Sequence, residues 1–195
     1  VCPPHAAVDV ARSLAGFAGV YLDANAVSPD TARRVAATLP AATFVDGGII
    51  GPPPTEPGVA KLFLSGRDAS AIPALFPNST LATEVISDRI GAASALKLTY
   101  AAWSKATKAL LLSVRAAAAR EGVEEVLARE WARSAPELPD YLEVSVRSSR
   151  TKGWRWVGEM EEVAELWAAC GLPDGFHRAA AEIFRRPPDD LAVGA

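Results

Sequence analysis

Hydrophobic and polar positions follow two different periods along this chain, and the period changes near residue 88. Before that point, short runs rich in β-branched and apolar residues alternate with stretches of helical period. These runs predict strands at residues 20–23, 43–46, 62–65 and 81–86, and helices at residues 6–14 and 29–39. Such alternation is typical of an α/β domain, which we place at residues 1–88.

The helix expected from residue 29 has a clear start signal. Ser28 can cap it, and Pro29 suits the first helical position. Asp30 carries a negative charge at the positive end of the helix dipole. The three residues together place the beginning of this helix firmly.

Residues 89–195 contain no convincing strand, and we expect them to form a helical domain. A very long helix is predicted from residue 89 to residue 121, where Gly122 can end it. Further helices are predicted at residues 123–134, 138–150, 157–170 and 174–185, before Pro187 and Pro188 close the folded part. The predicted fold class is therefore α/β followed by all-α, with a long interdomain helix.

The long helix is apolar around most of its circumference, which indicates a place in a core or an interface. One stripe of it, within an arc of about 100°, is polar and basic; it contains Ser94, Lys97, Ser104, Lys105, Lys108 and Arg115. For Lys105 to Arg115 the simplest interpretation is a solvated face. Lys97 lies where the two domains meet, a favoured place for a ligand cleft, so a surface role and a functional role both stay open for it.

Composition narrows the class of protein. The chain has 195 residues, of which 50% are hydrophobic, and a formal net charge of −3. Lys and Arg are scattered, so we do not expect a nucleic-acid groove. Cys2 and Cys170 are too few for a disulfide framework and lack metal-ligand neighbours, which suits a reducing cytoplasm without a structural zinc site. No apolar run is long enough for a membrane helix.

The first residues predict that further sequence precedes Val1. The chain does not begin with Met, and its only methionine is Met160. Val1-Cys2-Pro3-Pro4 has the pattern of a strand that ends in a loop. We therefore expect an upstream segment.

Four segments occur in an order that belongs to a known family: Val1-Cys2-Pro3-Pro4-His5, Tyr21-Leu22-Asp23-Ala24-Asn25, Phe44-Val45-Asp46-Gly47-Gly48 and Gly91-Ala92-Ala93-Ser94-Ala95-Leu96-Lys97. With them, the chain resembles the 6-phosphogluconate dehydrogenase and 3-hydroxyisobutyrate (β-hydroxyacid) dehydrogenase superfamily over nearly its whole length. It is most similar to a branch whose helical domain has no known function. The resemblance implies that residues 1–88 are the C-terminal part of a Rossmann-like NAD(P)-binding domain. It also implies that residues 89–195 form a helical substrate and dimerisation domain.

The resemblance implies a hydride-transferring enzyme that uses NAD or NADP. No Gly-x-Gly-x-x-Gly stands between a strand and a helix here, so the resemblance implies that this fingerprint lies upstream, in about 70 residues. Lys97 matches the family lysine that acts as acid and base at the hydroxyl or carbonyl. A desolvated ammonium has a lowered pKa, which suits that role. Pro3, Pro4 and Asn25 are implied to contact the cofactor.

Substrate contacts are implied for Gly48, Ile50, Gly51, Ser94 and Tyr100. Several positions depart from the family pattern. Ala93 and Ala101 replace a glycine and a substrate-binding asparagine, and Ile50 replaces a serine, so a larger or more apolar substrate fits better than a small hydroxy acid. Gly158 and Glu159 stand where relatives have Lys-Asp. Glu159 and Glu162 can face the cleft, or serve only as dipole partners in a first helical turn.

We expect the partners to be a small-molecule substrate and a second copy of the chain in a homodimer, with no nucleic acid and no membrane. Two alternatives stay open. The first is an imine-reductase-like enzyme, against which the retained Lys97 argues. The second is a non-catalytic dimerisation or binding module.

Overall fold

The computed structural model describes residues 1–186, which divide into two compact units. Unit 1 consists of Val1–Tyr100 and Glu165–Leu172. Unit 2 consists of Ala101–Ala164 and residues 173–186. Strands occur only in unit 1, and within the described residues the chain is helical from Ala92 onward. The predicted order of an α/β part followed by an all-α part is confirmed.

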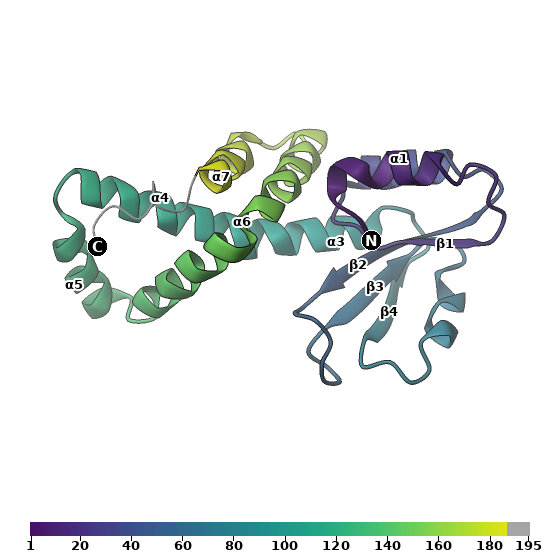
Figure 1. Ribbon diagram of the computed structural model, residues 1–195, viewed down its shortest axis with the longest axis horizontal. Coiled ribbons are helices and arrows are strands. Elements are labelled where there is room, and N and C mark those ends of the chain that lie inside the picture. The colour runs from purple at the N-terminus through teal and green to yellow at the C-terminus, as the bar shows by residue number, and fades with distance from the viewer. Residues whose placement is uncertain (187–195) are drawn as a thin grey trace. The chain divides into compact units, whose positions relative to one another are not determined.

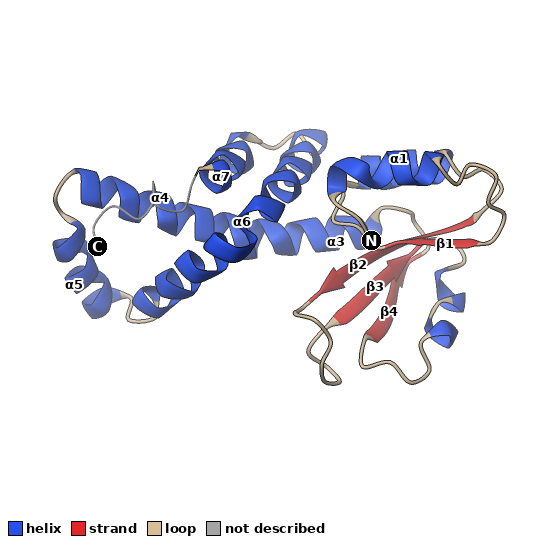
Figure 2. Ribbon diagram, viewed as in Figure 1, coloured by secondary structure: helices blue, strands red, loops and turns tan. Residues whose placement is uncertain are grey.

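Unit 1 is built on a four-stranded sheet whose strands lie in chain order (Figures 1 and 2). The strands are β1 (Val20–Asp23), β2 (Thr43–Ile50), β3 (Lys61–Ser65) and β4 (Ala82–Ser87). β1 and β2 are parallel, β2 and β3 are antiparallel, and β3 and β4 are parallel. All four strands were predicted. β2 is longer than predicted because residues 47–50 pair with β3, so Gly48 and Ile50 lie in a strand.

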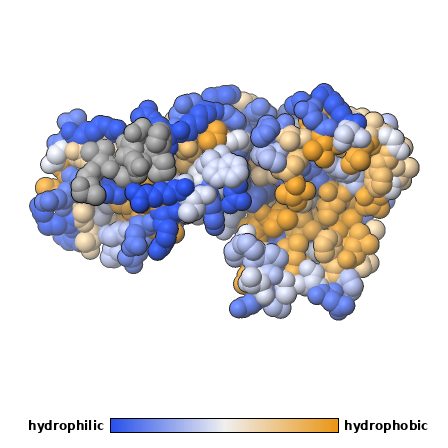
Figure 3. All heavy atoms as spheres, viewed as in Figure 1, coloured by the Kyte–Doolittle hydropathy of each residue, from blue (hydrophilic) through white to orange (hydrophobic). Residues whose placement is uncertain are grey.

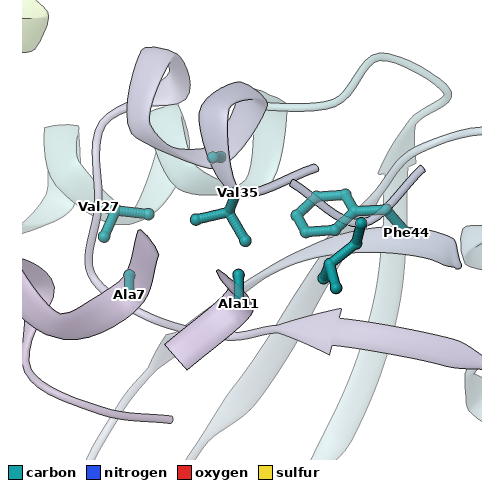
Figure 4. Packing of buried hydrophobic residues seen from close by; sticks show 7 residues of the cluster. Ala7, Ala11, Val27, Val35 and Phe44 are labelled. Carbon is teal, nitrogen blue, oxygen red and sulfur yellow. The ribbon is translucent and has the colours of Figure 1, made fainter. Parts of the chain in front are cut away.

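Two helices cover one face of this sheet. A short 3-10 turn, η1 (Pro4–Ala6), leads into α1 (Ala7–Arg12), and α2 (Pro29–Ala37) begins as predicted. The hydroxyl of Ser28 accepts a hydrogen bond from the backbone N of Thr31 at 3.2 Å. Figure 4 shows the side chains that join the helices to Phe44 of β2. The buried members of this cluster are Ala7, Ala11, Val27, Ala32, Val35, Leu39 and Phe44.

The opposite face of the sheet carries a second core. Its buried members are Val45, Leu62, Leu64, Ala69 and Ile72. Two of them come from η2 (Ala69–Ala71) and the residue after it, and η3 (Pro73–Leu75) follows. Because side chains alternate along a strand, Phe44 of β2 faces α1 and α2, whereas Val45 and Ile49 face this second core. Figure 3 shows hydrophobic residues gathered over the visible face of unit 1, and Val20 of β1 and Val85 of β4 are 48% and 44% exposed.

The predicted long helix consists of three consecutive segments. They are α3 (Ala92–Ala101), a π-helical segment η4 (Ala102–Ala106) and α4 (Thr107–Arg120). Gly122 follows with a φ of +71°, which is the left-handed conformation that favours glycine at a helix end. α5 (Glu124–Ser134) and α7 (Gly175–Arg185) also match their predictions.

One helix prediction is wrong. Residues 138–150 and 157–170 do not form separate helices, because α6 runs without a break over Leu138–Ala169. The break predicted between residues 150 and 157 contains Gly153, but one glycine costs a helix only about 1 kcal/mol relative to alanine. Packing compensates: the Trp156 ring meets Phe184 of α7 edge to face, with centroids 5.1 Å apart.

Two further observations complete the description. Within residues 1–186, no helix is both long enough and apolar enough to cross a membrane. The predicted end of the folded part at Pro187 and Pro188 lies outside the described residues.

Candidate functional site

The start of α3 is fastened to the sheet by two buried side chains. Oδ2 of Asp46 accepts hydrogen bonds from the backbone N of Gly91 (3.0 Å) and of Ser94 (3.1 Å), and Oγ of Ser65 accepts one from the N of Ala93 (3.0 Å). The Ser94 hydroxyl donates to Oδ1 of Asp46 at 2.6 Å, and the Ser65 hydroxyl donates to Oδ2 at 2.8 Å. We call Asp46, Ser65 and Ser94 the Asp46 cap. It satisfies the backbone donors that the first turn of a helix leaves unpaired.

Lys97 lies one turn further along α3. Its Nζ donates a hydrogen bond to the backbone carbonyl of Ile49 at 2.6 Å. Gly48, the preceding residue of β2, allows the strand and the helix to come this close. A Cβ on Gly48 would lie 2.7 Å from the Ala93 carbonyl oxygen and 3.0 Å from Lys97 Cβ. The half-buried Lys97 is therefore held against the backbone of β2.

Asp46 and Ser65 were not among the residues predicted from the sequence to serve the site. One signal for them was present. No Ser, Thr, Asp or Asn stands at residue 91, directly before α3, so its cap had to come from elsewhere. An acid within the otherwise apolar run 43–50 is a candidate for that role. The pairing itself joins residues 48 positions apart, which spacing along the chain does not reveal.

The carboxyl end of β1 lies beside Asp46 because Asp23 and Asp46 are register partners in the parallel pair. Asp23 is 3% exposed, and burial raises the pKa of its carboxyl, with Asp46 adding to the rise. Its Oδ1 accepts a hydrogen bond from the N of Asn25 at 2.8 Å. Oδ1 of Asn25 in turn accepts one from the N of Cys2 at 2.5 Å. These contacts hold the loop that contains Pro3 and Pro4 beside Asn25.

The remaining predicted substrate residues differ in their surroundings. Ile50 ends β2, is half-buried, and shares a face with Gly48 because side chains alternate. Gly51 has a φ of +123°, and a Cβ at this position would collide with Val59 and Ala60. The backbone conformation therefore requires glycine here. Ser94 is 1% exposed within the Asp46 cap, whereas Tyr100 is 49% exposed.

The polar stripe does not continue as a solvated face, which corrects the interpretation of Lys105. The ammonium of Lys105 forms an ion pair with Glu159 of α6, and the two side chains are only 17% and 9% exposed. Glu159 therefore has a partner inside unit 2, which gives it a role as the counter-ion of a half-buried lysine. Among the described residues, no group of three His, Cys, Asp or Glu residues could hold a metal ion.

Two later members of the stripe also make contacts in unit 2. Nζ of Lys108 lies 4.3 Å from the centre of the Tyr141 ring, and burial lowers the pKa of its ammonium. Nε of Arg115 lies 2.6 Å from Glu124. The stripe is thus used for packing between helices.

A cavity of about 270 Å³ lies in unit 1 on a different side of α3 from Lys97. Gly91 and Ala95 are the residues of the α3 region that line it, together with Ser28, Pro29, Asp30, Arg33, Arg89, Glu165, Leu166, Ala169 and Cys170. Lys97 is absent from its lining, so this cavity is separate from the candidate site.

Comparison with known proteins gives one domain match and one curated relative. Residues 118–186 match the family described as "Domain of unknown function (DUF1932)". A protein of Methanothermus fervidus, described as an uncharacterized 28.5 kDa protein in the 7S RNA 5' region, is 32% identical over 126 residues. The match covers 64% of this chain and 49% of that protein, so the chain spans about half the length of its curated relative.

Solved structures share the fold. A conserved hypothetical protein from Sinorhizobium meliloti is similar at a TM-score of 0.73 and 27% identity, covering 95% of this chain and 64% of that one. The conserved protein MTH1747, itself reported to be structurally similar to 3-hydroxyacid dehydrogenases, gives 0.71 and 27%, covering 100% and 76%. The 3-hydroxyisobutyrate dehydrogenase of Mycobacterium tuberculosis gives 0.63 and 16%, covering 99% and 74%. The predicted resemblance to 3-hydroxyisobutyrate dehydrogenase-like proteins is confirmed at the level of the fold.

Proposed function

We propose that this 3-hydroxyisobutyrate dehydrogenase-like chain forms the substrate side of an NAD(P)-dependent oxidoreductase, with Lys97 as its acid and base. The observation that carries the proposal is the position of Lys97. Its Nζ is held 2.6 Å from the Ile49 carbonyl, near the carboxyl end of β2. Asn25 follows the carboxyl end of the parallel strand β1. Ligands of open α/β sheets bind at the carboxyl ends of the strands, where these residues lie.

The chemistry at Lys97 is proton transfer. During oxidation, the free amine of Lys97 accepts the proton of a substrate hydroxyl as hydride leaves the same carbon; during reduction, its ammonium returns a proton to the carbonyl oxygen. An ammonium carries three N–H donors, and the bond to Ile49 uses one of them, which orients the group.

The nicotinamide cofactor supplies the acceptor or donor of hydride. Asn25, Pro3 and Pro4 are the residues that we propose to contact it. The local geometry fits, because Asn25 is fixed through Asp23 and Cys2 at the carboxyl end of β1. A solved structure of similar fold supports the choice of cofactor class: the reductive aminase of Aspergillus terreus, 17% identical at a TM-score of 0.50, was crystallised with NADPH.

The substrate is proposed to carry an apolar group beside its reacting carbon. Ile50 is half-buried on the face of β2 that bears Gly48, and Tyr100 lies one turn beyond Lys97 on α3. We assign these two side chains, with the backbone of Gly48 and Gly51, to the substrate pocket. Ser94 contributes to this pocket indirectly, because its hydroxyl donates a hydrogen bond to Asp46 in the Asp46 cap.

The test uses the protein expressed from its complete gene. Binding and turnover of NADH and NADPH are measured against hydroxy acids, aldehydes, ketones and imines, for the wild type and for Lys97→Ala. The matched control is Lys61→Ala, which removes a lysine of unit 1 that pairs with Glu84 on β4. Loss of the acid and base should lower kcat at least about 100-fold and leave cofactor binding intact.

The same experiment separates the alternatives. Turnover with imines alone would show that the reaction is imine reduction and not a reaction at a hydroxyl or carbonyl. Failure to bind either cofactor would refute the oxidoreductase and leave a binding module. Unchanged turnover in Lys97→Ala would refute the role of Lys97 alone.

We also propose that the helical part forms a homodimer. Trp103 of η4 and Trp154 of α6 are each 71% exposed, and Leu110 of α4 is 47% exposed. Large aromatic residues at the surface are enriched in interfaces. Light scattering at micromolar concentration should give twice the chain mass, and Trp103→Glu should lower it; a monomeric wild type would refute the dimer.

A further inference from the structure

Asp46 is a buried acid that no cation neutralises within the described residues. Its side chain lies in a residue that is 1% exposed, and both oxygens are used only by hydroxyl and backbone donors. Burying a carboxylate is costly, and such groups add less to stability than to a defined geometry. The positive end of the α3 dipole offsets part of the cost. The reason for burying Asp46 therefore lies in the groups that it holds in place.

What Asp46 positions is the turn of α3 that precedes Lys97. Asp46 binds Ser94, and Ile49 binds Lys97. The two contact points are three residues apart on β2 and also three residues apart on α3. Gly48 lies between the two points and brings the elements into contact. The strand and the helix are thus joined in one register along the whole turn.

We infer that Asp46 is a positioning residue for Lys97. The inference rests on the proposed function of Lys97 as acid and base. Through Ser94 and the first backbone donors of α3, the carboxylate fixes the helix start, and this fixes the point from which the long lysine side chain reaches Ile49. Without the cap, the first turn loses its acceptors and the lysine loses its anchor.

α2 shows why this cap differs from an ordinary one. There, Ser28 accepts a hydrogen bond from the backbone N of Thr31, three residues further along the same segment. In α3, the acceptors come from β2 and β3, so the cap ties the helix to the sheet. Removal of either cap destabilises a helix, but only the Asp46 cap determines where Lys97 lies.

Three variants test the inference in the protein expressed from its complete gene. Asp46→Asn replaces one acceptor oxygen by an amide that cannot accept from Ser65, Gly91 or Ser94. Ser94→Ala removes one hydrogen bond and serves if Asp46→Asn does not fold. Ser28→Ala is the matched control, because Ser28 is also 1% exposed and caps a helix of the same unit.

The first readout does not depend on catalysis. Acetylation of Lys97 in the folded protein is followed by peptide mass spectrometry, with Lys61 as internal reference, and amide exchange is followed over residues 93–97. Losing one hydrogen bond of ordinary strength shifts a local opening equilibrium about fivefold. We expect the acetylation rate of Lys97 and the amide exchange rate of residues 93–97 to rise by about that factor in Ser94→Ala and by a larger factor in Asp46→Asn. Neither rate should rise in Ser28→Ala. Equal reactivity of Lys97 in all folded variants would overturn the inference.

The second readout is turnover. Misplacing a reacting group by about 1 Å can cost about 100-fold in rate, so kcat should fall by about 10-fold to 100-fold in Asp46→Asn, with cofactor Kd unchanged. Ser28→Ala should keep its kcat. If Lys97→Ala is inactive and Asp46→Asn is fully active, the inference fails and the proposed function stands. If Lys97→Ala is fully active, the proposed role of Lys97 as acid and base fails, and the reactivity of Lys97 still decides whether Asp46 positions it.

Discussion

Replacing Gly48 by alanine tests the close approach of β2 and α3. The added Cβ would lie 2.7 Å from the carbonyl oxygen of Ala93 and 3.0 Å from Lys97 Cβ. The first neighbour is backbone within the capped turn of α3, so rotation of a side chain cannot relieve the contact. Either α3 moves away from β2, or β2 bends.

The magnitude follows from two opposing effects. Overpacking of a methyl group into a well-packed place typically costs about 1–3 kcal/mol. The change from glycine to alanine also restricts the unfolded chain, which stabilises by about 0.4–1 kcal/mol. The free energy of unfolding should therefore fall by about 1–2 kcal/mol, which corresponds to a decrease in Tm of about 2–8 °C for a chain of this size.

The assay is urea unfolding together with thermal unfolding, and Gly16→Ala is the control. Gly16 has no atom within 4 Å of the added Cβ and no left-handed φ, so its alanine variant should be as stable as the wild type or more so. Displacement of α3 should also raise the reactivity of Lys97. A Gly48→Ala variant as stable as Gly16→Ala would refute the close approach.

Three further predictions concern single residues. Gly153→Ala should stabilise the continuous α6 by about 0.5–1 kcal/mol in urea unfolding, because its Cβ would meet Phe184 and Ser149 at ordinary distances of 3.7 and 3.8 Å; a loss of stability would contradict an unbroken helix. Burial lowers the pKa of His177 below 6.5, so protonation of the unfolded state should reduce the free energy of unfolding as pH falls below that value, and His177→Gln should lose this dependence between pH 7 and pH 5. Burial raises the pKa of Asp23, so Asp23→Asn should be more stable than the wild type at neutral pH, and the difference should shrink as pH falls through the raised pKa toward 3.8; a constant difference would contradict the raised pKa.

Local signals predicted the elements of unit 1 well because each is specified by its own residues. β1 was placed to the residue, and α2 begins at its serine and proline as expected. The wrong predictions concern positions whose secondary structure depends on residues far away in the sequence. Trp156 and Phe184, which are 28 positions apart, help hold α6 together across Gly153, and residues 47–50 became strand because β3 pairs with them.

The candidate site likewise combines features that local sequence predicts with features that depend on distant residues. Lys97 was found from its position on a polar stripe and from the family resemblance, whereas the partners that hold it were not. Ile49 contributes a backbone carbonyl, which any residue would provide, and Asp46 acts across 48 positions. The later stripe residues were misinterpreted because their partners, such as Glu159 for Lys105, stand on another helix.

Under the proposed function, the alternation along β2 should separate residues that affect the rate from a residue that affects the choice of substrate. Asp46, Gly48 and Ile50 share one face, while Ile49 packs into the second core of the sheet. Asp46 and Gly48 meet α3 directly, so we expect changes at either residue to affect Lys97 with every substrate. Ile50 lies at the end of the same face and is half-buried, and the carbonyl that accepts a hydrogen bond from Lys97 is that of Ile49. Ile50→Ser should therefore change the ratio of kcat/KM between apolar and polar substrates and leave Lys97 reactivity as in the wild type, whereas a uniform loss for all substrates would place Ile50 with Asp46 and Gly48 instead.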